Sequence, residues 1–446
     1  MTPMPTASLA IRLIEQEARA LLTRLSLVKP FALNDTMVPA ASVPIPAQAA
    51  IETFLAAGRR HLAHMVHGFI RWIRSGAGSR LPVHQVQRRF TLLRLRFNGV
   101  LTQFDIFAAV MTQRSQTEIG VWLSGLDVAS ADAIQIPGRF YAAPPIVCYL
   151  DRGHGAAIRR ARTRLPGGGQ NPVGVLRIPR ERMVGSGIAS SLVHEVGHQA
   201  SALLDLVNSV RPVLRGMQTT ASPERLAWQL WDRWISEIVA DFWSVAKLGV
   251  GSTLGLMGVV SLPRIFVLRL DMSDPHPAPW IRVKLSCAVG KMLYPDPQWD
   301  VLAQIWESYY PLDGADPKLR QVFGLLQNTI PAFVNLLVNH RPRSLRGASM
   351  REALDVGQHQ PARLRELFHL WRTSPGRIFA ASPTVAFAVV GQARADGNIS
   401  PEHEARMIGK LLTHWALRSS LDTSTICAAN SALRPAAVAS ESIFLH

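Results

Sequence analysis

The stretch SSLVHEVGHQAS, residues 190–201, places two histidines four positions apart in a run that contains no lysine, arginine or aspartate. An α-helix has 3.6 residues per turn, so His194 and His198 lie on one helical face, one turn apart. The aliphatic positions that indicate burial of this helix are Leu192, Val193 and Val196. We therefore predict a helix in the core of the protein that presents two imidazoles on one face.

Glu195 follows the first histidine and completes the pattern HExxH. Two imidazoles on successive turns can bind one Zn²⁺ at about 2.0–2.1 Å, and the adjacent carboxylate can act as a general base on metal-bound water. The alternative is a core helix whose two histidines are only hydrogen-bonded. We favour zinc, with His194 and His198 as two of its ligands, because the whole pattern occurs within one apolar helix.

A catalytic zinc ion needs a third protein ligand and an open position for water. The metzincin pattern would place glycine and histidine where this chain has Ser201 and Leu204, so that class is excluded. The stretch SEIVADFW, residues 236–243, offers Glu237 and Asp241 one turn apart on a second apolar helix. We predict that Glu237 binds zinc and that Asp241 accepts the remaining N–H of a ligating histidine. Two acids on a solvated helix face are the alternative, which the large apolar neighbours disfavour.

HExxH followed by ExxAD resembles the gluzincin metallopeptidases, especially the branch that contains the CAAX prenyl endopeptidases. That branch also has a later HPxxxxR element, and this chain has HPAPWIR at residues 276–282. The resemblance implies that His194, His198 and Glu237 bind zinc, that Glu195 is the base and that Asp241 orients a histidine. It adds His276 and Arg282, one of which would stabilise the oxyanion or order the site. That branch usually has transmembrane helices, and none is convincing here, so its membrane substrates are not carried over.

Two short aliphatic runs bounded by proline and glycine predict strands near residues 144–153 and 171–183. Helical periodicity dominates elsewhere, so the predicted fold class is mainly α with a small β-sheet. The resemblance implies a gluzincin-like core, a short sheet with the HExxH helix and the glutamate-bearing helix, flanked by helical modules. In gluzincins the strand before the HExxH helix pairs with an extended substrate, and the resemblance gives this role to residues 172–178.

Changes in composition along the chain suggest how it is organised. We expect an N-terminal helix (1–33), a proline- and alanine-rich linker (34–50), a helical module (51–140), a zinc metallopeptidase core (141–345) and a C-terminal helical module (346–446). Within the core, we expect long helices over residues 186–213, 222–248 and 298–340.

Composition narrows the class of protein. Hydrophobic residues make up 48 % of the 446 residues, which excludes a disordered chain. The three cysteines are far apart, which argues against a disulfide framework and a cysteine metal site. The N-terminus is predicted to be an amphipathic helix and not a signal peptide. The stretch that most resembles a membrane span, residues 248–262, has no charged side chain but is shorter than the roughly 20 residues that span a bilayer. We expect a cytoplasmic protein without an integral membrane span.

The formal net charge of +17 comes almost entirely from arginine. A basic chain can bind nucleic acid or an anionic membrane, but no run of five like charges is present, so charge spread over a solvated surface is favoured. The expected partner is a protein or peptide substrate. Nucleic acid is a partner that the sequence does not favour.

Near the C-terminus, the stretch DGNISPEHE at residues 396–404 faintly suggests a calcium loop. The EF-hand pattern needs alternating acids and a glutamate at position twelve, which are missing. The stretch also resembles a turn of TerB-like helical domains. We favour the interpretation that Ser400 caps a helix with Pro401 in its first turn, and leave open a metal near Asp396.

These patterns together predict a zinc-dependent endopeptidase in which metal-activated water attacks the peptide bond and Glu195 is the general base. One alternative is a catalytically inactive zinc-fold protein that binds nucleic acid or another acidic partner through its basic surface. A second alternative is a zinc ion that only stabilises the fold. The intact glutamate of HExxH favours the enzyme, because a scaffold does not need a base.

Overall fold

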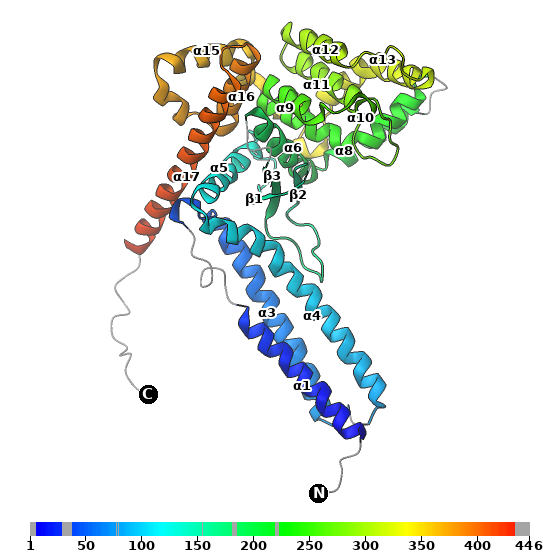
Figure 1. Cartoon of the computed structure of the whole chain (residues 1–446), viewed down its shortest axis with the longest axis vertical. Coiled ribbons are helices and arrows are strands. Elements are labelled where there is room, and N and C mark those ends of the chain that lie inside the picture. Colours follow the sequence, from blue (N-terminus) through cyan, green and yellow to red (C-terminus); the bar gives the residue numbers. More distant parts are fainter. Residues whose placement is uncertain are drawn as a thin grey trace.

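The computed structural model describes residues 6–28, 38–76, 78, 80–153, 155–180, 185–218 and 223–432. This part of the chain is mostly helical and contains a small three-stranded sheet, which confirms the predicted fold class at that level. Figure 1 shows a helical body from which a long helical stalk projects, with the strands close to the junction between them.

The stalk consists of three long helices: α1 (Thr6–Leu27), α3 (Ile45–Arg74) and α4 (Val83–Thr112). They lie side by side along the stalk and share a core of their own (Figure 1). Apolar side chains at heptad-like spacing form that core, including Leu55, Leu62 and Val66 of α3.

The start of α3 differs from the sequence prediction. Residues 45–50, which we expected in the linker, form its first turns. Proline is compatible with the first turn of a helix, because its missing N–H would have no partner there. Pro46 therefore belongs to the helix start, although the high proline content of residues 34–50 predicted a linker.

The sheet consists of β1 (Ile146–Asp151), β2 (Ala157–Arg159) and β3 (Gly174–Pro179), in the order β1-β3-β2. β3 pairs in parallel with β1 and antiparallel with β2. Successive side chains of a strand point to opposite faces, so the sheet contributes to two cores. Cys148 and Leu176 lie in the core of the body, whereas Val147 and Val175 lie in the core of the stalk. The sheet thus joins stalk and body.

The body is built from the remaining helices. Their bounds are α5 (Thr117–Ala133), α6 (Ser186–Leu203), α7 (Leu206–Gln218), α8 (Arg225–Leu248), α9 (Val250–Val260), α10 (Arg264–Val267), α11 (Pro279–Leu293), α12 (Gln298–Tyr309), α13 (Pro317–Asn339), α14 (Met350–Ala353), α15 (Pro361–Thr373), α16 (Pro383–Ala395) and α17 (Pro401–Ala432). Short 3-10 helices are η1 (Pro39–Ala41), η2 (Gln113–Ser115), η4 (Arg343–Leu345), η5 (Val356–His359) and η6 (Pro375–Ala380).

One continuous hydrophobic core extends through the body. It includes residues of α5, from the predicted 51–140 module, and of α16 and α17, from the predicted C-terminal module. α5 packs against β1 and α17 and not within the stalk. The boundary between the two cores therefore does not coincide with residue 140.

Two of the predicted long helices are interrupted. The helix expected over 186–213 ends at Leu203, and α7 begins at Leu206. Asp205 between them has a left-handed backbone with φ of 51° and accepts a hydrogen bond from the side chain of Asn208 at 2.6 Å. The helix expected over 298–340 is also divided, into α12, which ends at Tyr309, and α13, which begins at Pro317. Apolar residues continue across the break at Asp205, so periodicity did not reveal it, whereas the second break contains the turn residues of PLDG at 311–314.

α13 is, among the described helices, the one that is long and apolar enough to cross a membrane by length and composition alone. Inside the protein, 44 % of its apolar window is buried. Phe323, Phe333 and Leu337 of this helix belong to the core of the body. Core helices of folded domains pass the same test of length and composition.

Candidate metal centre

The predicted ligands lie where α6 and α8 pack together. Gly197, within the HExxH pattern, permits a close approach of the two helices. A Cβ at this position would lie only 3.0 Å from the Cα and carbonyl oxygen of Ala240 and from the Cβ of Trp243. The missing side chain therefore lets the histidine face of α6 approach the acidic face of α8.

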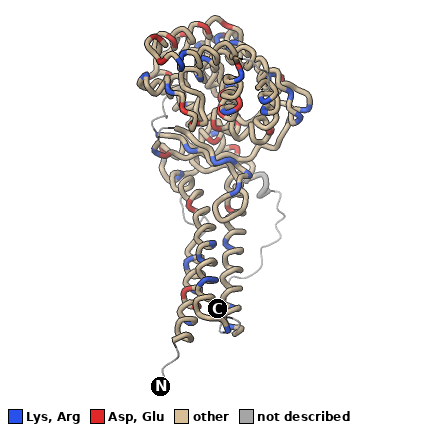
Figure 2. Tube along the Cα trace, turned by 90° about the vertical axis from the view of Figure 1, so that its right-hand side faces the viewer, with Lys and Arg blue, Asp and Glu red and all other residues tan. Residues whose placement is uncertain are grey.

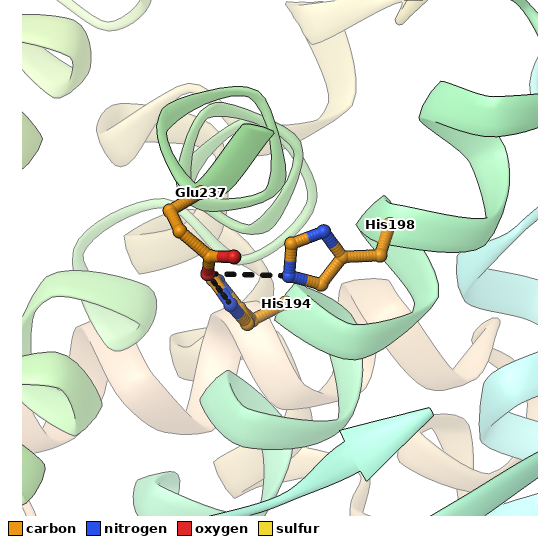
Figure 3. A group of neighbouring side chains, drawn as sticks. All are labelled: His194, His198 and Glu237. Atoms are coloured by element: carbon orange, nitrogen blue, oxygen red, sulfur yellow. Dashed lines mark ion pairs between the residues drawn. The ribbon is translucent and has the colours of Figure 1, made fainter. Parts of the chain in front are cut away.

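His194, His198 and Glu237 converge at this contact (Figure 3). The Nε2 atoms of both histidines lie 3.3 Å from Oε2 of Glu237. Two ligand atoms that are each about 2.0–2.1 Å from a tetrahedral ion such as zinc lie about 3.3–3.4 Å apart. The three side chains therefore fit a metal ion. In the described parts of the chain, no other such group of three or more histidine, cysteine, aspartate or glutamate side chains is found.

Asp241 connects His194 to Arg282. Its Oδ1 lies 2.8 Å from Nδ1 of His194, the ring nitrogen not directed at Glu237. Arg282 donates from Nε to Oδ2 at 2.7 Å and from Nη2 to Oδ1 at 2.8 Å. This series of contacts holds the imidazole in one orientation, as metal-bound histidines require. Of the two roles expected for the HPxxxxR residues, the position of Arg282 fits ordering of the site.

His276 reaches the same glutamate from the loop before α11. Its Nε2 lies 3.1 Å from Oε2 of Glu237, and its Nδ1 lies 2.8 Å from Oδ1 of Asp274. The ring has 43 % of its side-chain surface exposed, against 13 % for His194. His276 is thus oriented by a carboxylate but remains open to a molecule that enters from solvent.

Glu195 is largely buried and lines a small cavity of about 110 Å³ beside His194. His276, from the loop before α11, and Arg282, from α11, also line it. Gly155 and Ala156, which immediately precede β2, complete this part of the wall. One water occupies about 30 Å³, so this space accommodates a few waters or one peptide group. The structure therefore brings all seven residues predicted for the site into one place.

Burial and close opposite charges together determine the pKa values of the site. Burial alone would raise the pKa of Glu237, but hydrogen bonds from the three histidines hold it far below its usual value. Burial would also raise the pKa of Asp241, and Arg282 and His194 hold it well below its usual value. Burial lowers the pKa of His194, but Asp241 and Glu237 outweigh burial and raise it to about 9. Both carboxylates are therefore ionised at neutral pH. Arg282 balances the charge of Asp241, and a metal ion bound by Glu237 would displace the proton of His194.

The prediction that residues 172–178 pair with substrate is wrong. β3, which contains the predicted residues 172–178 in large part, is the central strand, and its backbone is paired with β1 on one side and β2 on the other. It has no free edge for a further strand. Gly155 and Ala156, which immediately precede β2, line the cavity, and within the described sheet the outer edge of β2 is unpaired.

Two features of the site were missed in the sequence. Asp274, the partner of His276, precedes it by two residues in SDPHP, a spacing typical of an aspartate that accepts a turn N–H. That spacing could have identified it. β2 has only three residues and carries no alternating apolar pattern, so no sequence signal indicated it.

The turn near Asp396 is not a metal group in the structure. Both carboxylate oxygens of Asp396 accept hydrogen bonds from Arg365, at 3.0 and 3.1 Å. The backbone N–H of His403 donates to the hydroxyl of Ser400 at 3.3 Å, and α17 begins at Pro401. The predicted helix cap at Ser400 is confirmed.

Comparison with known proteins gave no relatives. No protein-family model matches the chain, and neither the curated proteins nor the solved structures include a match. The chemistry of the site must therefore be argued from the chain's own residues.

Proposed function

We propose that this protein is a zinc-dependent endopeptidase of gluzincin type. The observation that carries the proposal is the convergence of His194, His198 and Glu237, because each histidine lies 3.3 Å from the glutamate oxygen, a separation that tetrahedral zinc coordination produces. Two imidazoles, one carboxylate and an open side are the donor set of hydrolytic zinc sites.

Bound zinc would lower the pKa of a water towards about 7 and polarise the scissile carbonyl. Glu195, on the cavity wall next to His194, takes the proton of the attacking water and returns it to the leaving amine. His276, oriented by Asp274 and open to solvent, donates a hydrogen bond to the carbonyl oxygen as negative charge develops there. Arg282 acts through Asp241, which holds His194.

The unpaired edge of β2 can align a peptide substrate. An extended peptide can add to the unpaired edge of β2, which places its backbone along the cavity that Gly155 and Ala156 line. The cavity of about 110 Å³ holds little more than the scissile peptide group. Substrate side chains would then contact the surface outside it.

The test is a comparison of wild type with Glu195→Gln. We expect both proteins to bind one zinc by elemental analysis, and only the wild type to cut a mixed peptide library, read by mass spectrometry. Loss of a general base typically lowers the rate by about 10²–10⁴-fold. Glu366→Gln, on the exposed surface of α15, is the matched control and should cut normally. Equal cleavage by Glu195→Gln and wild type would disprove the mechanism.

His194→Ala tests the metal site separately. The variant should lose the zinc ion, because it removes one ligand and the contact with Asp241. Zinc retained at full occupancy would mean that the metal lies elsewhere.

The second candidate function is nucleic-acid binding, which the positive charge of the stalk favours. Residues 6–28 and 38–112 contain twelve arginines and four acidic residues, a net charge of +8. Basic residues follow the stalk along its length (Figure 2). Salt-dependent binding of DNA, together with no metal-dependent cleavage of any peptide in the library, would favour a binding protein over the endopeptidase.

A further inference from the structure

A second cavity, of about 600 Å³, lies in the C-terminal part of the body. α15 and η6 form one wall and α17 the other, in the region labelled α15 to α17 in Figure 1. It shares no lining residue with the cavity beside Glu195. Volumes of about 300–1,000 Å³ are typical of sites for small molecules.

The walls of this cavity are mainly apolar. α17 presents His403, Met407 and Leu411 at spacings of four residues, so these side chains share one face. The apolar lining side chains are Phe368, Trp371, Pro375, Ile378, Phe379, Ile399, Met407 and Leu411.

Cations surround the apolar walls. Arg372, His403 and Lys410 line the cavity and are exposed, and no acidic side chain lines it. Across the described residues, neither Arg372 nor Lys410 forms an ion pair. Arg365 on the same helix as Arg372, by contrast, binds Asp296 and Asp396. The cavity therefore combines an apolar interior with two unpaired cations.

We propose that this cavity binds a small amphiphile with one alkyl chain and one carboxylate, a medium- or long-chain fatty acid. The alkyl chain would lie against the aromatic and aliphatic walls, and the carboxylate would pair with Arg372 and Lys410. A peptide fits less well, because its buried amides need partners and Asn398 is the only side-chain amide in the lining.

Isothermal titration of the full chain with hexanoate, octanoate and decanoate, all below their micelle concentrations, tests the proposal. Each added CH₂ should increase the affinity by up to about fourfold, the factor for a fully buried methylene. Octan-1-ol, which has the chain of octanoate without its charge, should bind at least about tenfold more weakly.

Variants locate the site. The double variant Arg372→Met/Lys410→Met keeps apolar side chains but removes both charges, and should weaken decanoate binding by at least about tenfold. Arg377→Met removes an exposed cation of η6 that does not line the cavity, and should bind as wild type does. Met407→Glu would place a negative charge at the wall and should abolish binding, with an unchanged circular dichroism spectrum as the folding control.

Three results would overturn the proposal. They are no saturable binding of decanoate, equal affinity for octanoate and octan-1-ol, or unchanged affinity in the double variant. In the first of these cases, co-sedimentation of the protein with phosphatidylglycerol vesicles would show that the ligand is a bilayer surface.

Discussion

Asp241 shows how one buried carboxylate can determine the geometry of a metal site without binding the metal. It contacts Nδ1 of His194 on one side and receives two hydrogen bonds from Arg282 on the other. Arg282 neutralises it, so the aspartate stays ionised although it is buried. The orientation of His194 therefore depends, through Asp241, on Arg282, which is more than eighty positions away in the sequence.

We expect Asp241→Asn to lower zinc affinity by about 10–100-fold, because the amide no longer fixes the imidazole and leaves Arg282 without a charged partner. Competition with a chromophoric chelator measures the affinity. Asp232→Asn is the control, since Asp232 lies on the same helix but pairs with Arg211 and Arg215. Wild-type affinity in Asp241→Asn would show that His194 does not depend on this carboxylate.

Helices α6 and α8 form the site because their backbones approach closely at Gly197. The three ligands come from the facing surfaces of these helices, so a small change in separation moves Glu237 relative to both histidines. The glycine in this HExxH pattern consequently has a packing role that is separate from the chemistry of its neighbours.

Gly197→Ala should destabilise the protein by about 1–3 kcal/mol and weaken zinc binding, because its Cβ would lie 3.0 Å from α8. Thermal unfolding and the chelator competition measure the two effects. Gly187→Ala, near the start of the same helix, is the matched control, since no atom lies within 4 Å of a Cβ there. If both alanine variants behave alike, close packing at Gly197 is not what positions the ligands.

The whole molecule has two cores that meet at the sheet, and a buried histidine in η5 lies far from the metal centre in sequence. His359 is 5 % exposed, and in the described structure neither of its ring nitrogens has a hydrogen-bond partner. Burial, together with the nearby Lys247 ammonium, lowers the pKa of His359 to about 3. This side chain is therefore neutral in the folded protein at all but acidic pH.

His359 should make the protein sensitive to acid. The unfolded chain binds a proton at this imidazole below about pH 6.5, whereas the folded chain does not until about pH 3. Its contribution to stability is thus present above pH 6.5 and is lost as pH falls towards 3, by at most about 1.4 kcal/mol per pH unit.

Urea unfolding midpoints between pH 7.5 and 5 measure this contribution. His359→Leu should flatten the pH dependence, while His369→Leu, an exposed histidine of α15, should keep the wild-type slope. Parallel slopes for His359→Leu and wild type would contradict the assignment.

The predictions that succeeded rest on local patterns. Apolar periodicity identified α6 and α8, although it missed the break at Asp205, where a left-handed residue interrupts a continuous pattern. Ser400 was identified as a cap because a cap depends on neighbours within one turn. The spacing of His194 and His198 placed two imidazoles on one face for the same reason.

The sequence by itself thus determined that α6 and α8 are helices, and which of their side chains share a face, because these properties depend on residues one turn apart. Only the tertiary structure decided that β3 is central and β2 is an edge strand, that α5 joins the body, and that Asp241 meets Arg282. These contacts join distant segments, and their choice depends on how the whole core packs, which no local pattern records.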